Sequence, residues 1–243
     1  MNGNYCIADL IIEIDSIYET VHELCAAYRC SACHGLSVHT TQQDIDKERV
    51  LSVREKARFD RQQIDYSDPY LETLAVYRTI AEQTPKYDTF LFHGSCVAVD
   101  GLGYMITAKS GTGKSTHTRL WRELLGDRAV MVNDDKPLIH IAENGAFAYG
   151  TPWDGKHHLS NNIAVPLKAV CILERSAENR IREITPSEAL PMLLQQVYRP
   201  MNAAAMARTL NLIDLLAGHV KLYRLGCNMD VSAAELSYNT MKG

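Results

Sequence analysis

A short run of small and basic residues near the middle of the chain has a spacing suited to binding phosphate. Residues 108–116 read AKSGTGKST, between an apolar strand pattern and a helical pattern. Gly111 and Gly113 allow backbone N–H groups to turn inward around a polyphosphate, and the following helix adds its dipole. Lys114 then offers a positive charge to the outer phosphates, and Ser115 offers a hydroxyl to Mg²⁺. We therefore expect ATP and Mg²⁺ as ligands.

The loop as a whole should contact the nucleotide. The residues expected to do so are Ser110, Gly111, Thr112, Gly113, Lys114, Ser115 and Thr116. Ala108 occupies the position where the common motif has its first glycine, so this corner must adopt a negative φ or accept strain. A glycine-rich turn without a ligand is the alternative. The order strand, loop, lysine, serine and helix favours phosphate binding.

Two adjacent carboxylates, Asp134 and Asp135, directly follow the apolar stretch AVMVN of residues 129–133. A lone Asp-Asp pair is typical of a turn, but the apolar stretch indicates the end of a strand. We expect this strand to lie beside the strand that leads into the phosphate loop. One carboxylate could then hold the metal while its neighbour accepts a proton from a hydroxyl group.

The segment from Phe90 to Asp135 resembles the catalytic core of HPr kinase/phosphorylase. Like that family, it has a His-Gly pair on a strand, a Gly-x-Gly turn, a Ser-Gly-x-Gly-Lys-Ser loop and an Asp-Asp pair, in this order. The family shares its fold with ATP-type phosphoenolpyruvate carboxykinase. The resemblance therefore implies a mixed, β-rich α/β core of the P-loop type. The residue pattern before this core predicts an N-terminal α+β extension.

The resemblance also implies a role for each matching residue. Lys114 would bind phosphate, and Ser115 and Asp134 would lie on the metal side. Asp135 would be the catalytic base, with His93 as its helper. Without the resemblance, a buried structural histidine would be the better interpretation of His93.

Polar residues are unusually dense in a second segment, residues 150–162, which read GTPWDGKHHLSNN. In one interpretation this loop recognises the substrate, with Lys156 facing the transferred phosphate and Asp154 as a replacement metal ligand. In the other it is an exposed polar connection pinned by Trp153. The acidic metal ligand that HPr kinase/phosphorylase carries after its Asp-Asp strand has no clear equivalent here.

The function favoured by these motifs is an ATP-dependent kinase with a hydroxyl acceptor. The acceptor is Ser or Thr of a peptide or protein, or a small-molecule alcohol, since proteins related to HPr kinase include peptide-modifying kinases. The phosphorylase signature is unrecognisable and residues 1–88 do not resemble an HPr-binding domain. A non-catalytic ATP-binding regulator and a carboxykinase-like enzyme are the alternatives, although the second would need paired arginines and a longer chain.

Composition excludes several classes of partner. The chain of 243 residues has a net charge of -4, so we expect neither nucleic acid nor an anionic membrane as partner. It lacks an apolar run long enough to span a membrane and a recognisable leader, which predicts a cytoplasmic protein. Seven cysteines include the pattern Cys30-x-x-Cys33-His34, which we expect to carry neither haem nor zinc. The oligomeric state is left open.

The sequence divides into an extension, residues 1–88, and a catalytic core, residues 89–243. In the extension, residues 5–15 alternate like a half-buried strand, Ser16 and Glu19 form a capping-box pattern, and residues 69–83 look helical. The extension could contribute to substrate binding. In the core we expect a hairpin turning at residues 100–103, the phosphate-loop helix, further strands, and two C-terminal helices.

Overall fold

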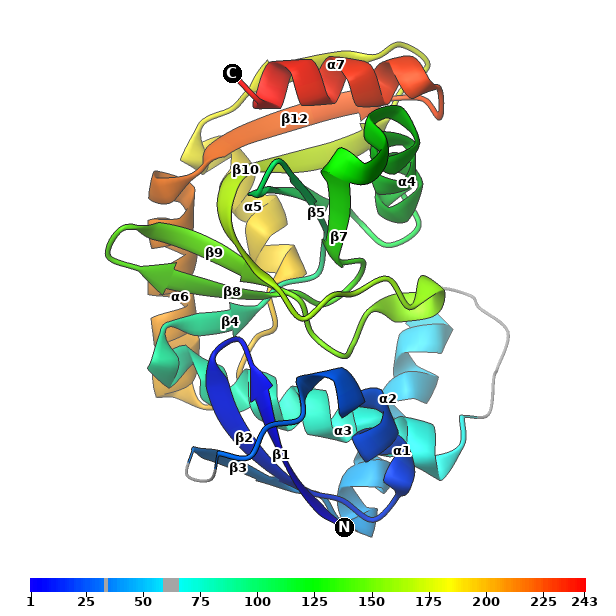
Figure 1. Cartoon of the computed structure of the whole chain (residues 1–243), viewed down its shortest axis with the longest axis vertical. Coiled ribbons are helices and arrows are strands. Elements are labelled where there is room, and N and C mark those ends of the chain that lie inside the picture. Colours follow the sequence, from blue (N-terminus) through cyan, green and yellow to red (C-terminus); the bar gives the residue numbers. More distant parts are fainter. Residues whose placement is uncertain (33–34, 59–65) are drawn as a thin grey trace. The chain divides into compact units, whose positions relative to one another are not determined.

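The computed structural model of the protein describes residues 1–32, 35–58 and 66–243 (Figure 1). The chain separates into two compact units, the N-terminal unit Met1–Gln83 and the C-terminal unit Thr84–Gly243. The sequence analysis placed the boundary after residue 88. Among the described residues, no helix combines the length and the apolar character that crossing a membrane requires.

The N-terminal unit combines a small sheet with helices. Its strands are β1 (Asn2–Ile7), β2 (Leu10–Asp15) and β3 (Leu36–His39), in the order β1-β2-β3, and its helices are α1 (Glu19–Leu24), α2 (Gln42–Arg58) and α3 (Asp68–Gln83). The helix expected over residues 69–83 is confirmed. The single strand expected over residues 5–15 is wrong: it is a β1–β2 hairpin, because Ala8 and Asp9 both adopt positive φ, 53° and 58°.

The capping box predicted at the start of α1 is also wrong. The Ser16 hydroxyl donates to the carbonyl of Tyr18 instead of capping the helix. The carboxylate of Glu72, fully buried on α3, accepts hydrogen bonds from the backbone N–H groups of Ile17 (2.7 Å) and Tyr18 (2.8 Å) and from the hydroxyl of Thr40 (2.6 Å). A side chain far away in sequence therefore holds the segment that leads into α1, and no side chain caps the helix itself.

A mixed sheet of nine strands organises the C-terminal unit, which confirms a mixed, β-rich α/β architecture. Its strands are β4 (Thr89–Leu91), β5 (Ser95–Val99), β6 (Leu102–Thr107), β7 (Ala129–Asn133), β8 (Leu138–Ala142), β9 (Gly145–Tyr149), β10 (Ala164–Arg175), β11 (Arg180–Glu183) and β12 (Lys221–Cys227). The main path runs β4-β8-β9-β10-β6-β5-β7, and β12 pairs with β10 and β11. Strands β6, β10 and β12 are parallel, and the other pairs are antiparallel.

The hairpin expected before the phosphate loop is confirmed. β5 and β6 are joined by Asp100 and Gly101, whose φ angles of 52° and 81° suit a two-residue turn that follows the twist of the strands. The neighbour expected for β7 is wrong, because β7 pairs with β5 and not with β6. β5 therefore separates the strand that ends in the acid pair from the strand that ends in the phosphate loop.

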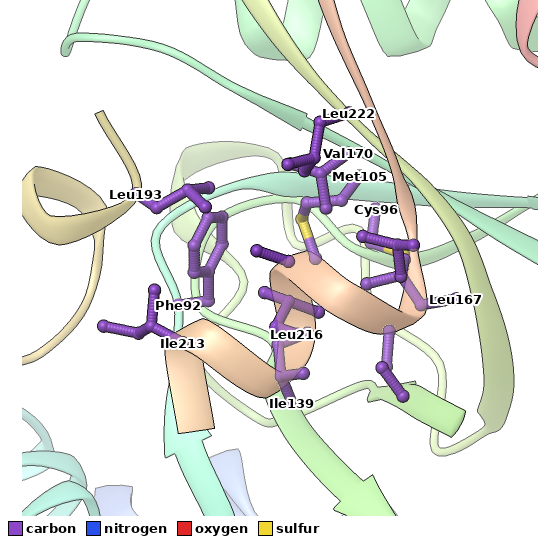
Figure 2. Packing of buried hydrophobic residues seen from close by; sticks show 14 of the residues in the cluster. Phe92, Cys96, Met105, Ile139, Leu167, Val170, Leu193, Ile213, Leu216 and Leu222 are labelled. Atoms are coloured by element: carbon purple, nitrogen blue, oxygen red, sulfur yellow. The ribbon is translucent and has the colours of Figure 1, made fainter. Parts of the chain in front are cut away.

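Both faces of this sheet are buried under helices. Alternate residues of β5 point to opposite sides, so Cys96 and Ala98 belong to one core and Val97 and Val99 to the other. The helices α5 (Pro186–Gln196) and α6 (Ala203–His219) contribute to the first core, and α4 (Lys114–Leu125) and α7 (Val231–Met241) to the second. Figure 2 shows Ile213 and Leu216 of α6 packed near residues of the first core.

Candidate active site

The phosphate loop connects the end of β6 to the start of α4. Gly111 and Gly113 have φ angles of 78° and 127°, which strain any other residue, although a Cβ atom added at either would meet nothing within 4 Å. These glycines are therefore required by the backbone and not by lack of space. Ala108 is buried and is not among the positive-φ residues of the described part of the chain, so this corner needs no glycine.

Lys114, the first residue of α4, is buried, with 8% of its surface exposed. Its Nζ donates to Nε2 of His93 (3.2 Å) and to the carbonyl of Ala108 (3.4 Å). Burial lowers the pKa of this ammonium group, although the charges of Asp135 and Asp134 act in the opposite direction. A buried lysine of this kind gains from an anionic ligand that replaces its lost hydration.

His93 is held on three sides in the break between β4 and β5. Its backbone N–H donates to the carbonyl of Gln196 (2.7 Å), and its carbonyl accepts from the hydroxyl of Thr107 (3.0 Å). Its ring Nδ1 donates to Oε1 of Gln196 (2.8 Å). With the hydrogen on Nδ1, the other ring nitrogen faces Lys114 Nζ and lies 3.3 Å from Oδ1 of Asp135.

The glycine that follows this histidine has a steric reason. A Cβ atom at Gly94 would lie 2.6 Å from Sδ of Met105 and 3.2 Å from the carbonyl oxygen of Ile106, both on β6. The N–H of Gly94 also donates to the carbonyl of Asp135 (3.1 Å). The His-Gly pair therefore allows close approach to the phosphate-loop strand and joins it to the acid pair.

The turn that carries the two carboxylates is organised by Asn133, a fully buried residue at the end of β7. Its Oδ1 accepts from the backbone N–H groups of Asp135 (2.9 Å) and Lys136 (2.7 Å). Its Nδ2 donates to the carbonyl oxygens of Thr151 (3.0 Å) and Trp153 (3.4 Å). One amide side chain thus joins the acid pair to the loop of residues 150–162.

The first carboxylate, Asp134, is 5% exposed and faces the phosphate-loop helix. Its Oδ1 accepts from the hydroxyl of Ser95 (2.5 Å), which in turn is bonded to the hydroxyl of Thr118 on α4 (2.8 Å). Thr118 also donates to the carbonyl of Ser115 (3.3 Å). A chain of hydrogen bonds therefore joins the two residues expected to bind Mg²⁺.

The second carboxylate, Asp135, lies between two basic side chains. Its Oδ1 is 3.3 Å from Nε2 of His93, and its Oδ2 accepts from Nζ of Lys136 (2.6 Å). Burial alone would raise the pKa of this carboxyl, but the His93 contact and the charge of Lys136 outweigh burial and hold it well below its ordinary value. Adjacent in sequence, the two carboxylates have different surroundings, which is what different roles require.

The donor set fits Mg²⁺. This cation prefers oxygen ligands and is commonly bound by one or two carboxylates together with phosphates of the substrate. Asp134 supplies a carboxylate and Ser115, in the first turn of α4, a hydroxyl. The part of the chain that the structure describes contains no group of three or more His, Cys, Asp or Glu residues arranged to hold a metal.

The loop of residues 150–162 packs against the acid pair through its backbone. Gly155 has a φ of 76°, and a Cβ atom there would lie 3.1 Å from Cβ of Asp135. The Asp154 side chain is 12% exposed, and its Oδ1 lies 3.2 Å from Nδ1 of His158. Burial raises the pKa of Asp154, and the charge of Asp134 adds to the shift. Lys156 is exposed on the surface. Both substrate assignments stay predictions.

Sequence reasoning missed three residues of this centre. Asn133 and Lys136 flank the acid pair in the sequence N-D-D-K, and that adjacency was an available signal. Gln196, at the end of α5, gave no signal, because only the fold brings it to His93. We expected the Cys30-x-x-Cys33-His34 segment to bind neither zinc nor haem. Cys33 and His34 lie outside the described residues, so this expectation is not tested.

A protein-family model described as "SynChlorMet cassette protein ScmC" matches residues 64–212, more than half of the chain, and the chain therefore belongs to this family. No curated protein matches it. Among solved structures, the chain is similar to the Hpr(Ser) kinase/phosphatase from Coxiella burnetii, at 11% identity and a TM-score of 0.36, over 63% of this chain and 99% of that one. A similarity of that size does not establish a shared function, and the resemblance to HPr kinase/phosphorylase stays a prediction.

Proposed function

We propose that this member of the ScmC family is an ATP-dependent kinase that transfers the γ-phosphoryl group to a hydroxyl acceptor. The observation that supports the proposal is the meeting of three side chains from separate segments: Lys114 after the phosphate loop, His93 from the β4–β5 break, and Asp135 from the turn after β7. Nε2 of His93 lies 3.2 Å from Lys114 Nζ and 3.3 Å from Asp135 Oδ1. The core would then be of the P-loop type seen in HPr kinase and phosphoenolpyruvate carboxykinase.

The phosphate loop and Lys114 would bind the β- and γ-phosphates. The loop offers backbone N–H groups and the N-terminus of α4, and Lys114 offers a buried positive charge. Asp134 and Ser115 would hold Mg²⁺, which supplies neutralisation of the phosphate charge. Binding and orientation of this kind provide most of the catalytic effect in phosphoryl transfer.

Asp135 would accept the proton of the acceptor hydroxyl. The acceptor oxygen forms a bond to the γ-phosphorus while the bond from that phosphorus to the bridging oxygen of ADP breaks. Nζ of Lys136 lies 2.6 Å from Oδ2 of this carboxylate, which makes the carboxylate a weak base. Phosphate oxygens give Lys136 a competing partner, so nucleotide binding would release Asp135 for proton transfer.

His93 would position Asp135 and Lys114 relative to each other. Because Gln196 accepts the hydrogen on Nδ1, the lone pair of Nε2 stays directed at Lys114. Gln196 therefore controls which way the imidazole ring faces.

The acceptor is proposed only by class: Ser or Thr of a peptide or protein, or a small-molecule alcohol. Asp154 and Lys156 are proposed to contact it, since the backbone of their loop packs on Asp135. The N-terminal extension of residues 1–88 is proposed to contribute to its recognition.

A second candidate function is a regulator that binds ATP without turning it over. It is favoured by one observation, that both oxygens of Asp135 contact basic side chains. In a regulator these contacts would persist after ATP binds. A measurement of transfer, and not of ATP binding, separates the two functions.

The test compares Asp135→Asn with Asp134→Asn, using MgATP and panels of peptide and alcohol acceptors. Asp135→Asn should keep MgATP affinity and lose transfer by about a hundredfold to ten-thousandfold, the usual contribution of a general base. Asp134→Asn should instead need much more Mg²⁺ for the same rate, because a hard cation loses an anionic oxygen.

Transfer at the wild-type rate by Asp135→Asn would reject the base assignment. Binding of MgATP by the wild-type protein without transfer to any acceptor, and without hydrolysis, would favour the regulator. A control variant, Asp127→Asn, changes an exposed carboxylate after α4 and should behave as wild type.

A further inference from the structure

Arg175 reaches the phosphate loop from outside. It is the last residue of β10, which runs parallel to β6 with Ile172 opposite Thr107, so the carboxyl ends of both strands lie at the same edge of the sheet. Its Nη2 donates to the carbonyl of Gly111 (2.5 Å), and its Nε donates to the carbonyl of Thr112 (3.3 Å). One guanidinium group therefore holds two consecutive carbonyls of the loop.

Holding a carbonyl also orients the N–H group on the other side of the same peptide bond, because the peptide unit is planar. The Gly111 carbonyl shares its plane with the Thr112 N–H, which closes a turn on the carbonyl of Lys109 (3.2 Å). The Thr112 carbonyl shares its plane with the N–H of Gly113, at the start of α4. The Arg175 contacts thus restrain the direction of the Thr112 N–H in its turn and of the Gly113 N–H at the start of α4.

The loop needs such a restraint because of its glycines. Gly111 and Gly113 are the residues with the greatest backbone freedom, and a phosphate can bind only when the loop has given up that freedom. The structure also shows no Cβ neighbour within 4 Å at either glycine, so packing does not hold them. The Arg175 hydrogen bonds come from outside the loop and restrain this pair of peptide planes.

We infer that Arg175 is a positioning residue that sets the phosphate loop in its binding conformation before the nucleotide arrives. The inference rests on the proposed function, because it assigns Arg175 to nucleotide binding. Arg175 acts through the loop and not on the reacting atoms. A planar guanidinium can span two carbonyls at once, and a lysine ammonium, a point charge on a flexible stem, cannot hold both in a fixed geometry.

A competing explanation is that Arg175 only attracts phosphate by its charge. Lysine at this position would then serve equally well, and the effect would disappear at high salt, since exposed charges are screened. If Arg175 positions the loop, lysine should not replace it, and the effect of its loss should persist at high salt. Arg175→Ala and Arg175→Lys therefore form the informative pair of variants, and Arg119→Ala is the control, because Arg119 is an exposed arginine of α4 that pairs with Glu123.

The first measurement is hydrogen exchange of the peptide covering residues 108–114 in the protein without nucleotide. Arg175→Ala and Arg175→Lys should both exchange faster there by about tenfold, the effect of losing roughly 1.4 kcal/mol of restraint, while Arg119→Ala matches wild type. Thermal melting of all variants should agree with wild type within a few degrees, since the side chain is exposed. Unchanged exchange of this peptide in Arg175→Ala would overturn the inference.

The second measurement is the Kd for MgATP at low and high salt. Both Arg175 variants should bind about tenfold more weakly at either salt concentration, which corresponds to about 1.4 kcal/mol. Full rescue by lysine, or loss of the difference at high salt, would show a charge effect and reject positioning. If the wild-type protein binds no MgATP, the proposed function fails, and the exchange measurement still decides whether Arg175 restrains the loop.

Discussion

The phosphate loop and the turn that carries the acid pair lie in the same unit, but they are stabilised in different ways. The loop is built from consecutive residues and depends on its backbone conformation, with Gly111 and Gly113 at positive φ and Arg175 bonded to it from outside. The acid-pair turn depends on Asn133, the residue directly before it, whose amide group is held in turn by backbone carbonyls of the distant loop of residues 150–162. The first site is therefore encoded locally, whereas the second also needs a contact with a segment far away in sequence.

This difference implies that the two sites should respond to substitution in separate ways. Removing the charge of Lys114 beside the loop should weaken nucleotide binding more than it lowers stability. Removing the Asn133 side chain from the turn should lower stability with little effect on nucleotide affinity. The first two predictions below test that separation.

The largest effect is expected from Lys114→Met, which keeps the length of the buried side chain and removes its charge. MgATP at a hundredfold excess over its Kd should stabilise the wild-type protein by about 2.7 kcal/mol and should leave this variant unchanged. Transfer should fall by about a hundredfold to a thousandfold, the usual effect of removing one preorganised donor. Thermal melting and rate assays measure both. Lys221→Met, at an exposed lysine of β12, is the control, and an equal nucleotide shift in both variants would contradict the prediction.

Asn133→Ala should mainly destabilise the protein. The backbone N–H groups of Asp135 and Lys136 would lose their acceptor, and unpaired groups of this kind cost about 1–3 kcal/mol each. We expect the free energy of unfolding to fall by about 3 kcal/mol and the Tm by about 10 °C. Below its Tm the variant should bind MgATP within about threefold of wild type.

The matched control for that change is Asn144→Ala, at an exposed asparagine in the β8–β9 turn. It should leave the Tm nearly unchanged. If Asn133→Ala weakens MgATP binding by much more than the expected threefold, the two sites are coupled and the contrast between them is wrong.

A smaller effect is expected on lowering the pH, through His117 on α4. Burial lowers the pKa of this imidazole from 6.5 to about 4, so the folded protein keeps it neutral while the unfolded chain protonates it. Its contribution to stability is therefore fully present above pH 6.5 and is lost as the pH falls toward 4. At pH 5 the loss is about 2 kcal/mol.

Urea unfolding of His117→Gln at pH 7 and pH 5 measures this contribution. The variant should lose about 2 kcal/mol less than wild type over that interval. His219→Asn, at an exposed histidine that ends α6, should follow the wild-type pH dependence. An unaltered pH dependence in His117→Gln would show that another group titrates.

The smallest effect is expected from Gln196→Met, which removes the acceptor for His93 Nδ1. The transfer rate should fall about fivefold, since one hydrogen bond contributes about 1 kcal/mol, while MgATP affinity stays the same. Gln196→Glu keeps an acceptor oxygen and should recover part of the rate. Gln195→Met, at the exposed neighbour, is the control, and a similar loss in both Met variants would point to disturbed packing of α5.

The sequence predicted the elements whose signals are local. The hairpin turning at Asp100 and Gly101, the helix that follows the glycine-rich loop, and the helix over residues 69–83 all appear where expected. These features are formed by neighbours in the chain. Local backbone preference and tertiary structure agree in each case.

The errors arose where distant residues decide the local structure. The Ser16 and Glu19 pattern failed because Glu72 supplies the hydrogen bonds instead. β7 was assigned to the wrong neighbour because sequence order does not give strand order, and β5 lies between. Gln196 could not be found at all, since nothing in its own sequence context indicates a contact with His93.

The placement of β12 limits how this protein can be divided for experiments. The family match ends at residue 212, yet β12 pairs with the central strand β10 along seven positions and α7 completes the second core. A fragment cut at the matched boundaries would leave β10 as an open hydrogen-bonding edge and would uncover one side of Trp121. At its other end it would keep α3, with the Glu72 carboxylate separated from all three of its donors. Such a fragment should aggregate, so expression trials should retain the strands on both sides of the matched segment.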